Sequence, residues 1–137
     1  MRKADEQAAL AESHRIDPTA LSEALGDALA YRRDEVSPDV LRRLRRGEFA
    51  VEDEIDLHLL GERAAEHLLR RFLAQAREDA HHCVRIVHGK GLHSPQGPVL
   101  KGMVERLLRQ RADVLAFASA PAAGGGTGAV LALLARR

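Results

Sequence analysis

Apolar residues recur at intervals of three and four along two long segments of the chain, the pattern of amphipathic helices. The first segment follows Gly61, and the second opens at Pro98, a residue that suits the first turn of a helix. The positions of the two apolar stripes are Ala65, Leu68, Leu69, Phe72, Leu73 and Ala76, and then Leu100, Met103, Val104, Leu107 and Leu108. Each segment is therefore predicted to be a helix with one apolar face.

Four shorter segments are rich in Val, Ile, Leu or Phe, and they alternate with these helices or follow them, as strands do. They cover residues 54–60, 83–88, 114–119 and 129–134. The glycines at 124–126 and 128 predict a turn between the last two. The predicted order is βαβαββ. Right-handed crossovers would place both helices on one face of a four-stranded mixed sheet, so the expected fold class is α/β, a two-layer sandwich.

The chain before residue 54 shows helix signals in place of strand signals. Asp17-Pro18 is a start signal, and leucines at helical spacing predict a helix over 18–33. Ser37-Pro38 repeats the signal and predicts a short helix that stops at Gly47. Residues 1–16 lack a clear stripe and are expected to be flexible. We therefore expect an N-terminal helical extension over residues 1–53 and one compact domain over 54–137.

Composition narrows the class of protein. A chain of 137 residues with 45% hydrophobic residues can bury one substantial core. Its single cysteine, Cys83, excludes an internal disulfide. The N-terminus lacks the apolar core of a signal peptide, and no apolar run approaches the roughly 20 residues that a membrane span needs. A soluble cytoplasmic monomer with no membrane contact is the expectation.

The net charge of +1 conceals an uneven distribution of charge along the chain. Residues 1–53 hold 9 Lys or Arg against 12 Asp or Glu, whereas residues 54–137 hold 12 against 8, so the two parts carry −3 and +4. The basic excess of the second part permits nucleic-acid binding without requiring it. The arginine-rich face at 42–46 fits either a solvated surface or a phosphate contact.

Polar residues stand where two of the predicted strands end. Asp56 and His58 lie two positions apart on one side of the first strand, and His88-Gly89-Lys90-Gly91 ends the second. The carboxyl ends of parallel strands meet at one edge of a sheet, where ligands commonly bind. The two motifs are therefore predicted to form one phosphate-handling site.

These residues resemble the Smr (small MutS-related) domain family, whose signatures are Leu-Asp-Leu-His-Gly on a strand and a later His-Gly-x-Gly. Residues 55–58 and 88–91 match those signatures, and residues 54–135 look like a whole Smr domain. Residues 42–49 are also similar to the segment that precedes the domain in stand-alone bacterial members. Leu59 departs from the pattern, because the family has glycine after the histidine. Gly61 stands where threonine commonly starts the helix, and glycine still serves as an N-cap.

The resemblance implies an endonuclease that nicks or cleaves DNA or RNA, with translating or collided ribosomes as its setting and the N-terminal helices as a targeting element. It assigns Asp56 and His58 to catalysis. A neutral histidine can take a proton from a ribose hydroxyl or from water, while the carboxylate orients the ring. His88, if it lies across the cleft, would protonate the leaving oxygen. The nucleic-acid phosphates would be held by Gly89, Lys90, Gly91, His93, Arg85 and Lys101.

Three classes of function stay open from the sequence. A metal-independent RNA endonuclease would use the 2′-hydroxyl as nucleophile and would cut in EDTA. A DNA-nicking endonuclease would need an activated water and a metal. A non-catalytic nucleic-acid or ribosome-binding module would bind in a salt-dependent way without cutting. No cofactor is expected, although Asp56, His58, His88 and His93 form an alternative set of ligands for a divalent ion.

Overall fold

The computed structural model describes residues 28–90 and 99–136. Its helices are α3 (Pro38–Arg45), α4 (Glu62–Glu78) and α5 (Val99–Gln110). Its strands are β1 (Ala30–Arg32), β2 (Asp53–Asp56), β3 (Cys83–Val87), β4 (Val114–Ser119) and β5 (Ala129–Leu134). Two short 3-10 turns, η1 (Ala122–Gly124) and η2 (Gly126–Gly128), connect β4 to β5.

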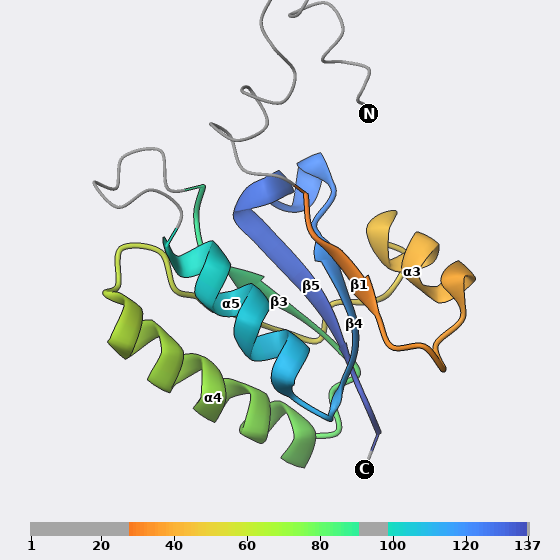
Figure 1. Ribbon diagram of the computed structural model, residues 1–137, viewed down its shortest axis with the longest axis horizontal. Helices are drawn as coiled ribbons and strands as arrows, with labels where there is room; N and C mark the ends of the chain where they lie inside the picture. Colours follow the sequence, from red (N-terminus) through yellow and green to blue (C-terminus); the bar gives the residue numbers. More distant parts are fainter. Residues whose placement is uncertain (1–27, 91–98, 137) are drawn as a thin grey trace, which may run out of the picture.

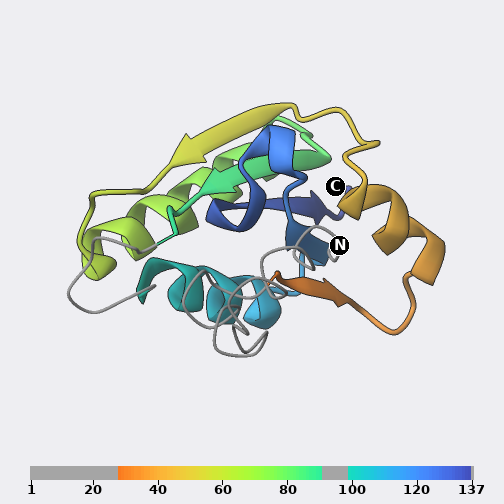
Figure 2. The ribbon, with the colours of Figure 1, turned by 90° about the horizontal axis from the view of Figure 1, so that it is seen from above.

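The strands form one mixed sheet in the order β1-β4-β5-β3-β2. The β2 and β3 strands are parallel, and β5 lies antiparallel between β3 and β4. Figure 2 shows β2 at one edge of the sheet and β1 toward the other. The predicted βαβαββ order is confirmed, and a fifth strand, β1, extends the four that the sequence predicts.

The strand β1 corrects the helix predicted over residues 18–33. Residues 30–32 pair antiparallel with β4, so the chain is extended there. The Tyr31 ring stacks on Phe117 with the centroids 5.1 Å apart, and Arg109 lies over the Tyr31 ring. These contacts with distant residues outweigh the local helical pattern. Residues 1–27, which carry most of that predicted helix, lie outside the described residues.

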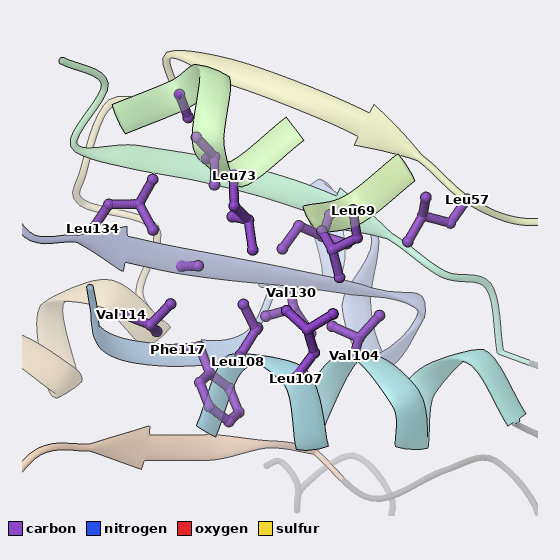
Figure 3. Close-up of a cluster of buried hydrophobic side chains, with 14 of the residues drawn as sticks. Leu57, Leu69, Leu73, Val104, Leu107, Leu108, Val114, Phe117, Val130 and Leu134 are labelled. Carbon is purple, nitrogen blue, oxygen red and sulfur yellow. The ribbon is translucent and has the colours of Figure 1, made fainter. Parts of the chain in front are cut away.

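The main core lies between the sheet and the pair of helices α4 and α5, which cover one of its faces (Figure 1). Figure 3 shows side chains from both helices meeting those of β4 and β5. Leu69 and Leu73 of α4 and Leu108 of α5 are fully buried. Burying a leucine contributes about 1.5–3 kcal/mol. The two predicted helical stripes therefore face this core as their spacing indicated, except for Leu68, which is 40% exposed.

The opposite face of the sheet is covered by α3, which adds a third layer to the expected two-layer sandwich (Figure 1). Leu44 of α3 is fully buried in a second cluster with Leu131 and Leu133. The Ser37 side chain caps the start of α3 by accepting from the Asp39 N–H, and Gly47 ends the segment with φ +74°. The central strand β5 is buried at every position because both faces of the sheet are covered.

Cys83 belongs to this second cluster, and burial raises the pKa of its thiol to about 11. The thiol is therefore protonated at neutral pH and behaves as a small apolar side chain. Within the described part of the chain, no helix is both long enough and apolar enough to cross a membrane.

Candidate functional site

The alternation of side chains along β2 separates a buried set from a polar set. Ile55 and Leu57 join the main core beneath α4 and α5, so Asp56 and His58 point to the other face of the sheet. The Leu57 N–H donates to the Val87 carbonyl over 2.7 Å, which extends the pairing with β3 beyond the last strand residue. The polar pair thus flanks a residue that is anchored both in the core and in the sheet.

Asp56 and His58 make two hydrogen bonds to each other through a single oxygen. Asp56 Oδ1 accepts from the backbone N–H of His58 at 3.0 Å and from the ring Nδ1 at 2.5 Å. The ring hydrogen bond holds the pKa of the Asp56 carboxyl below its usual value, so the group is a carboxylate at neutral pH. A carboxylate can only accept, which places the hydrogen of the neutral ring on Nδ1 and leaves Nε2 as the nitrogen that can accept a proton. Both side chains are about half exposed, at 49% each.

The chain turns sharply after this pair. The Leu60 N–H donates to the Leu57 carbonyl, and Leu59 in the third position of this turn has φ +74°. That position favours glycine, and a leucine there costs about 1–2 kcal/mol. The Leu59 side chain is 92% exposed. A glycine, which the resemblance leads us to expect at this position, would adopt this φ without the cost.

The second motif meets the first where β3 leaves the sheet. The backbone N–H groups of His88 and Gly89 both donate to the Gly128 carbonyl over 3.0 Å. Gly89 has φ +82°, and a β-carbon there would lie 3.3 Å from Cβ of His58. The absence of a side chain at Gly89 therefore lets the two motifs come together, as predicted.

Asp56 and His58 of the first motif and Gly89 and Lys90 of the second line one pocket of about 460 Å³. Its lining comprises Asp56, His58, Arg85, Val87, Gly89, Lys90, Ala123, Gly124, Gly125, Gly128 and Ala129. Lys90 is exposed at the pocket, and its ammonium forms no ion pair with the residues that the structure describes. A free ammonium beside an open pocket is suited to an anionic group such as phosphate.

Arg85 is the second cation of the pocket, but its charge is partly used within the protein. Its Nη2 and Nε contact Glu54 Oε1 at 2.5 and 3.0 Å, and its Nη1 donates to the Gly124 carbonyl at 2.9 Å. The side chain thereby ties β2 and β3 to the turn that carries Gly124. It contributes less positive charge to the pocket than Lys90 does.

The glycine-rich segment between β4 and β5 is a turn, as the sequence indicates, and it also forms one wall of the pocket. Sequence reasoning did not place Ala123, Gly124, Gly125 and Gly128 in the site. The N–H groups of Gly124 and Gly126 donate to Pro121, and that of Gly128 donates to Gly125. The segment therefore shapes the pocket without directing these three amides at a ligand. The Gly89 amide, expected to hold phosphate, is likewise bonded to Gly128.

His88 does not lie across the pocket from His58, contrary to the expected arrangement. It follows Val84 and Ile86 on the face of the sheet covered by α4 and α5, and only 3% of it is exposed. Its Nδ1 lies 2.6 Å from the Gly89 carbonyl oxygen. Burial lowers the pKa of His88 to about 4; the hydrogen bond to Gly89 opposes this shift, and the charge of Lys101 adds to it.

Lys101 is also separated from the pocket, because it belongs to α5 and is buried. Gly91 and His93 lie outside the described residues. Among residues 28–90 and 99–136, no three His, Cys, Asp or Glu side chains gather as a set that could hold a metal ion. The site that the structure assembles therefore consists of Asp56, His58, Lys90 and Arg85.

The sequence of this chain is similar to a known protein family and to curated proteins. The sequence model of the Smr domain matches residues 55–135. A ribosome rescue factor SmrB of Vibrio vulnificus (strain CMCP6) is 38% identical over 104 residues, which cover 76% of this chain and 56% of the relative. A ribosome rescue factor SmrB of Serratia proteamaculans (strain 568) is 32% identical over 140 residues, which cover 90% of this chain and 77% of the relative. The chain thus spans little more than half of the Vibrio protein.

Solved structures show the same fold. YdaL, a stand-alone small MutS-related protein from Escherichia coli, superposes with a TM-score of 0.71 at 28% identity, covering 82% of this chain and 86% of that protein. The Smr domain of Thermus thermophilus MutS2 superposes with a TM-score of 0.55 at 30% identity, covering 60% of this chain and 96% of that domain. Sequence and fold agree, and the chain belongs to the Smr domain family.

Proposed function

We propose that this protein is an endonuclease that cleaves RNA at the pocket formed by the two Smr motifs. The observation that carries the proposal is the Asp56–His58 pair, in which the aspartate fixes the ring of a pocket-lining histidine and leaves Nε2 to accept a proton. A histidine oriented by a carboxylate is a common general base. Lys90 supplies positive charge at the same pocket.

The chemistry requires one proton acceptor and one phosphate-binding cation. His58 Nε2 takes the proton of a ribose 2′-hydroxyl, and the 2′-oxygen then attacks the adjacent phosphorus. The bond from phosphorus to the 5′-oxygen breaks, and the departing oxygen takes a proton from water. The products are a 2′,3′-cyclic phosphate and a 5′-hydroxyl, and the imidazolium returns its proton to solvent.

The charged groups around His58 favour that sequence of steps. The Asp56 carboxylate stabilises the imidazolium as it forms, because the two groups share a hydrogen bond of 2.5 Å. Lys90 neutralises the charge that builds on the phosphate oxygens, and Arg85 adds a smaller contribution because Glu54 already pairs with it. RNA carries its own nucleophile, so the pair needs only to remove one proton.

Ribosome-bound mRNA is the proposed physiological substrate. The curated relatives from Vibrio vulnificus and Serratia proteamaculans bear the name ribosome rescue factor. The similarity to those proteins covers 76% and 90% of this chain. The segment before the matched domain would contribute to targeting, and β1 and α3 already belong to the folded body.

One observation favours a second candidate, a nucleic-acid or ribosome-binding module without cleavage. Leu59 occupies the left-handed position next to His58 that suits glycine. If the backbone at Leu59 shifts to relieve this strain, the turn changes shape and His58 is displaced from the geometry that cleavage needs. The same pocket would then hold phosphates without cutting the chain.

Cleavage assays with matched variants separate the two candidates. Wild type, His58→Ala and His67→Ala are incubated with end-labelled single-stranded RNA and with DNA of the same sequence, each with and without EDTA. His67 is a matched control because it is an exposed histidine on α4. We expect RNA cleavage by wild type and His67→Ala in EDTA, and its loss in His58→Ala. Equal cleavage by all three proteins would refute the assigned base, and salt-sensitive RNA binding without cleavage would favour the binding module.

A further inference from the structure

The buried side chain of His88 is hydrogen-bonded to the backbone of Gly89, a residue that lines the pocket. Its ring lies beneath the sheet in the layer of α4 and α5, and its Nδ1 contacts the Gly89 carbonyl at 2.6 Å. A carbonyl oxygen only accepts, so Nδ1 carries the hydrogen of this bond. His88 is therefore a donor to its neighbour's backbone.

The second ring nitrogen of His88, Nε2, has no role in proton transfer to the pocket. Its Nε2 is buried and has no hydrogen-bond partner among the described residues. The ring is neutral at pH 7, because burial and the nearby charge of Lys101 both disfavour its protonation. A neutral ring whose only N–H is bonded to Gly89 cannot supply a proton to a leaving oxygen.

The residue that His88 holds is the one in contact with the catalytic pair. Gly89 has φ +82°, and a β-carbon there would touch Cβ of His58 at 3.3 Å. Its N–H is held by the Gly128 carbonyl, while its C=O is held by the His88 ring. Both hydrogen-bonding groups of Gly89 are thus held within the protein, the N–H by the backbone of Gly128 and the C=O by the side chain of His88.

Lys90 follows this fixed residue directly. A β-carbon at Gly128 would lie 3.3 Å from Lys90 Cγ and 3.5 Å from the carbonyl carbon of Gly89, so the lysine stem packs closely over the glycine. The position of the ammonium therefore depends on how the Gly89 peptide is oriented. Because the His88 side chain is hydrogen-bonded to the Gly89 carbonyl, its orientation affects where the Lys90 ammonium lies.

We propose that His88 is a positioning residue, whose hydrogen bond to the Gly89 carbonyl holds the Gly89–Lys90 segment against His58 and directs Lys90 at the phosphate. This inference rests on the proposed function of the pocket as a phosphate site. It assigns the histidine of the second motif a role in binding geometry, and it removes that histidine from the proton-transfer steps. A histidine that only fills space in the core is the competing explanation.

The test uses two amide substitutions that differ in where they place an N–H group. In His88→Asn the side-chain amide nitrogen falls near the place of Nδ1 and can still donate to Gly89, whereas in His88→Gln the longer chain carries it toward the place of Nε2. Affinity is measured by fluorescence anisotropy with RNA that is 2′-O-methylated throughout and so cannot be cut, and kcat is measured separately with unmodified RNA. Lys90→Ala serves as the reference for loss of the cation.

We expect His88→Asn to bind within about 3-fold of wild type and His88→Gln to bind about 10-fold more weakly, which corresponds to the loss of one charge-assisted contact. His88→Gln combined with Lys90→Ala should bind no more weakly than Lys90→Ala alone, because both act through the same ammonium. Wild-type affinity in both amide variants would mean that His88 only fills the core. A 100-fold loss of kcat in both variants with unchanged affinity would restore His88 as the acid.

The outcome is separable from failure of the nuclease proposal. Binding of the methylated RNA and the ¹⁵N signals of the His88 ring and of the Gly89 and Lys90 amides are measured without any cleavage. A wild-type His88 ring with its hydrogen on Nε2 would overturn the inference even if the protein cuts RNA. If His88→Gln does not fold, judged by circular dichroism, then the ring signals and the His88→Asn arm still decide.

Discussion

Asp56 Oδ1 accepts two hydrogen bonds from His58, one from the backbone N–H at 3.0 Å and one from the ring Nδ1 at 2.5 Å. The carboxylate therefore sets both the backbone direction and the ring orientation of the residue two positions ahead. Leu57 between them is fully buried, so the pair stands on a rigid base. Both polar side chains are about half exposed, so a substrate can reach the pair.

Replacing Asp56 with Asn should reduce cleavage and spare binding. The substitution removes the charge that stabilises the imidazolium and the strict acceptor that fixes the ring hydrogen on Nδ1. We expect kcat to fall by about 10²–10⁴-fold, the range typical of lost acid-base assistance, while affinity for methylated RNA stays within about 3-fold. Single-turnover cleavage measures the first quantity. Asp53→Asn is the matched control on the same strand, and an equal loss in both variants would contradict the assigned pairing.

Replacing Leu59 with Gly should stabilise the protein. The left-handed φ of Leu59 costs about 1–2 kcal/mol, and the flexibility of glycine in the unfolded chain offsets about 0.5–1 kcal/mol of the gain. The exposed side chain loses few contacts. The free energy of unfolding in urea should therefore rise by about 0.5–1 kcal/mol. Leu60→Gly, one residue on and without positive φ, should lower it; a lower stability in Leu59→Gly would show that the turn is unstrained.

Replacing Lys90 with Ala should weaken RNA binding and change its dependence on salt. A lysine that neutralises one phosphate of a single strand contributes about 0.7 to the slope of log K against log salt concentration. We expect that slope to become shallower by about this amount in Lys90→Ala. Titration of methylated RNA at several salt concentrations provides the measurement. Arg71→Ala, an exposed cation on α4, should keep the wild-type slope, and an unchanged slope in Lys90→Ala would remove the lysine from the binding site.

The buried His88 should make the protein less stable in mild acid. The unfolded chain binds a proton at this residue near pH 6.5, whereas the folded protein does so only at about pH 4. Between these values the unfolded state binds more protons, so stability rises with pH by up to about 3 kcal/mol. Urea unfolding from pH 4.5 to 7.5 should show this rise in wild type and a flatter profile in His88→Asn. If wild type and His88→Asn show the same dependence of stability on pH, then His88 has the same pKa in the folded and unfolded states.

Local pattern was sufficient for the elements whose side chains repeat in a regular way. The bounds predicted for the last two strands agree with β4 and β5, because all of their residues except Ser119 are apolar. The three residues of β1 carry no such pattern, and they become a strand through pairing with β4 and through the stacking of Tyr31 on Phe117. Contacts between residues that are distant in sequence cannot be read from a local repeat.

The candidate site was predictable in part. The spacing of Asp56 and His58 placed them on one face, and the strand ends brought the second motif to them. The alternation of Val84, Ile86 and His88 carried the signal that the second histidine shares the buried face. The contribution of the glycine-rich turn depended on how β5 inserts between β3 and β4, which a linear pattern does not specify.

The chemical ends of the cut RNA show whether the 2′-hydroxyl or a water molecule attacks the phosphorus. Wild-type protein is incubated in EDTA with a synthetic RNA and with a second RNA that carries 2′-deoxyribose at the cleaved position, and the fragments are identified by mass spectrometry. We expect a 2′,3′-cyclic phosphate and a 5′-hydroxyl from the first RNA, and we expect the second RNA to stay intact. Cleavage of the deoxy substrate at the same position, or fragments with 5′-phosphate and 3′-hydroxyl ends, would contradict this expectation.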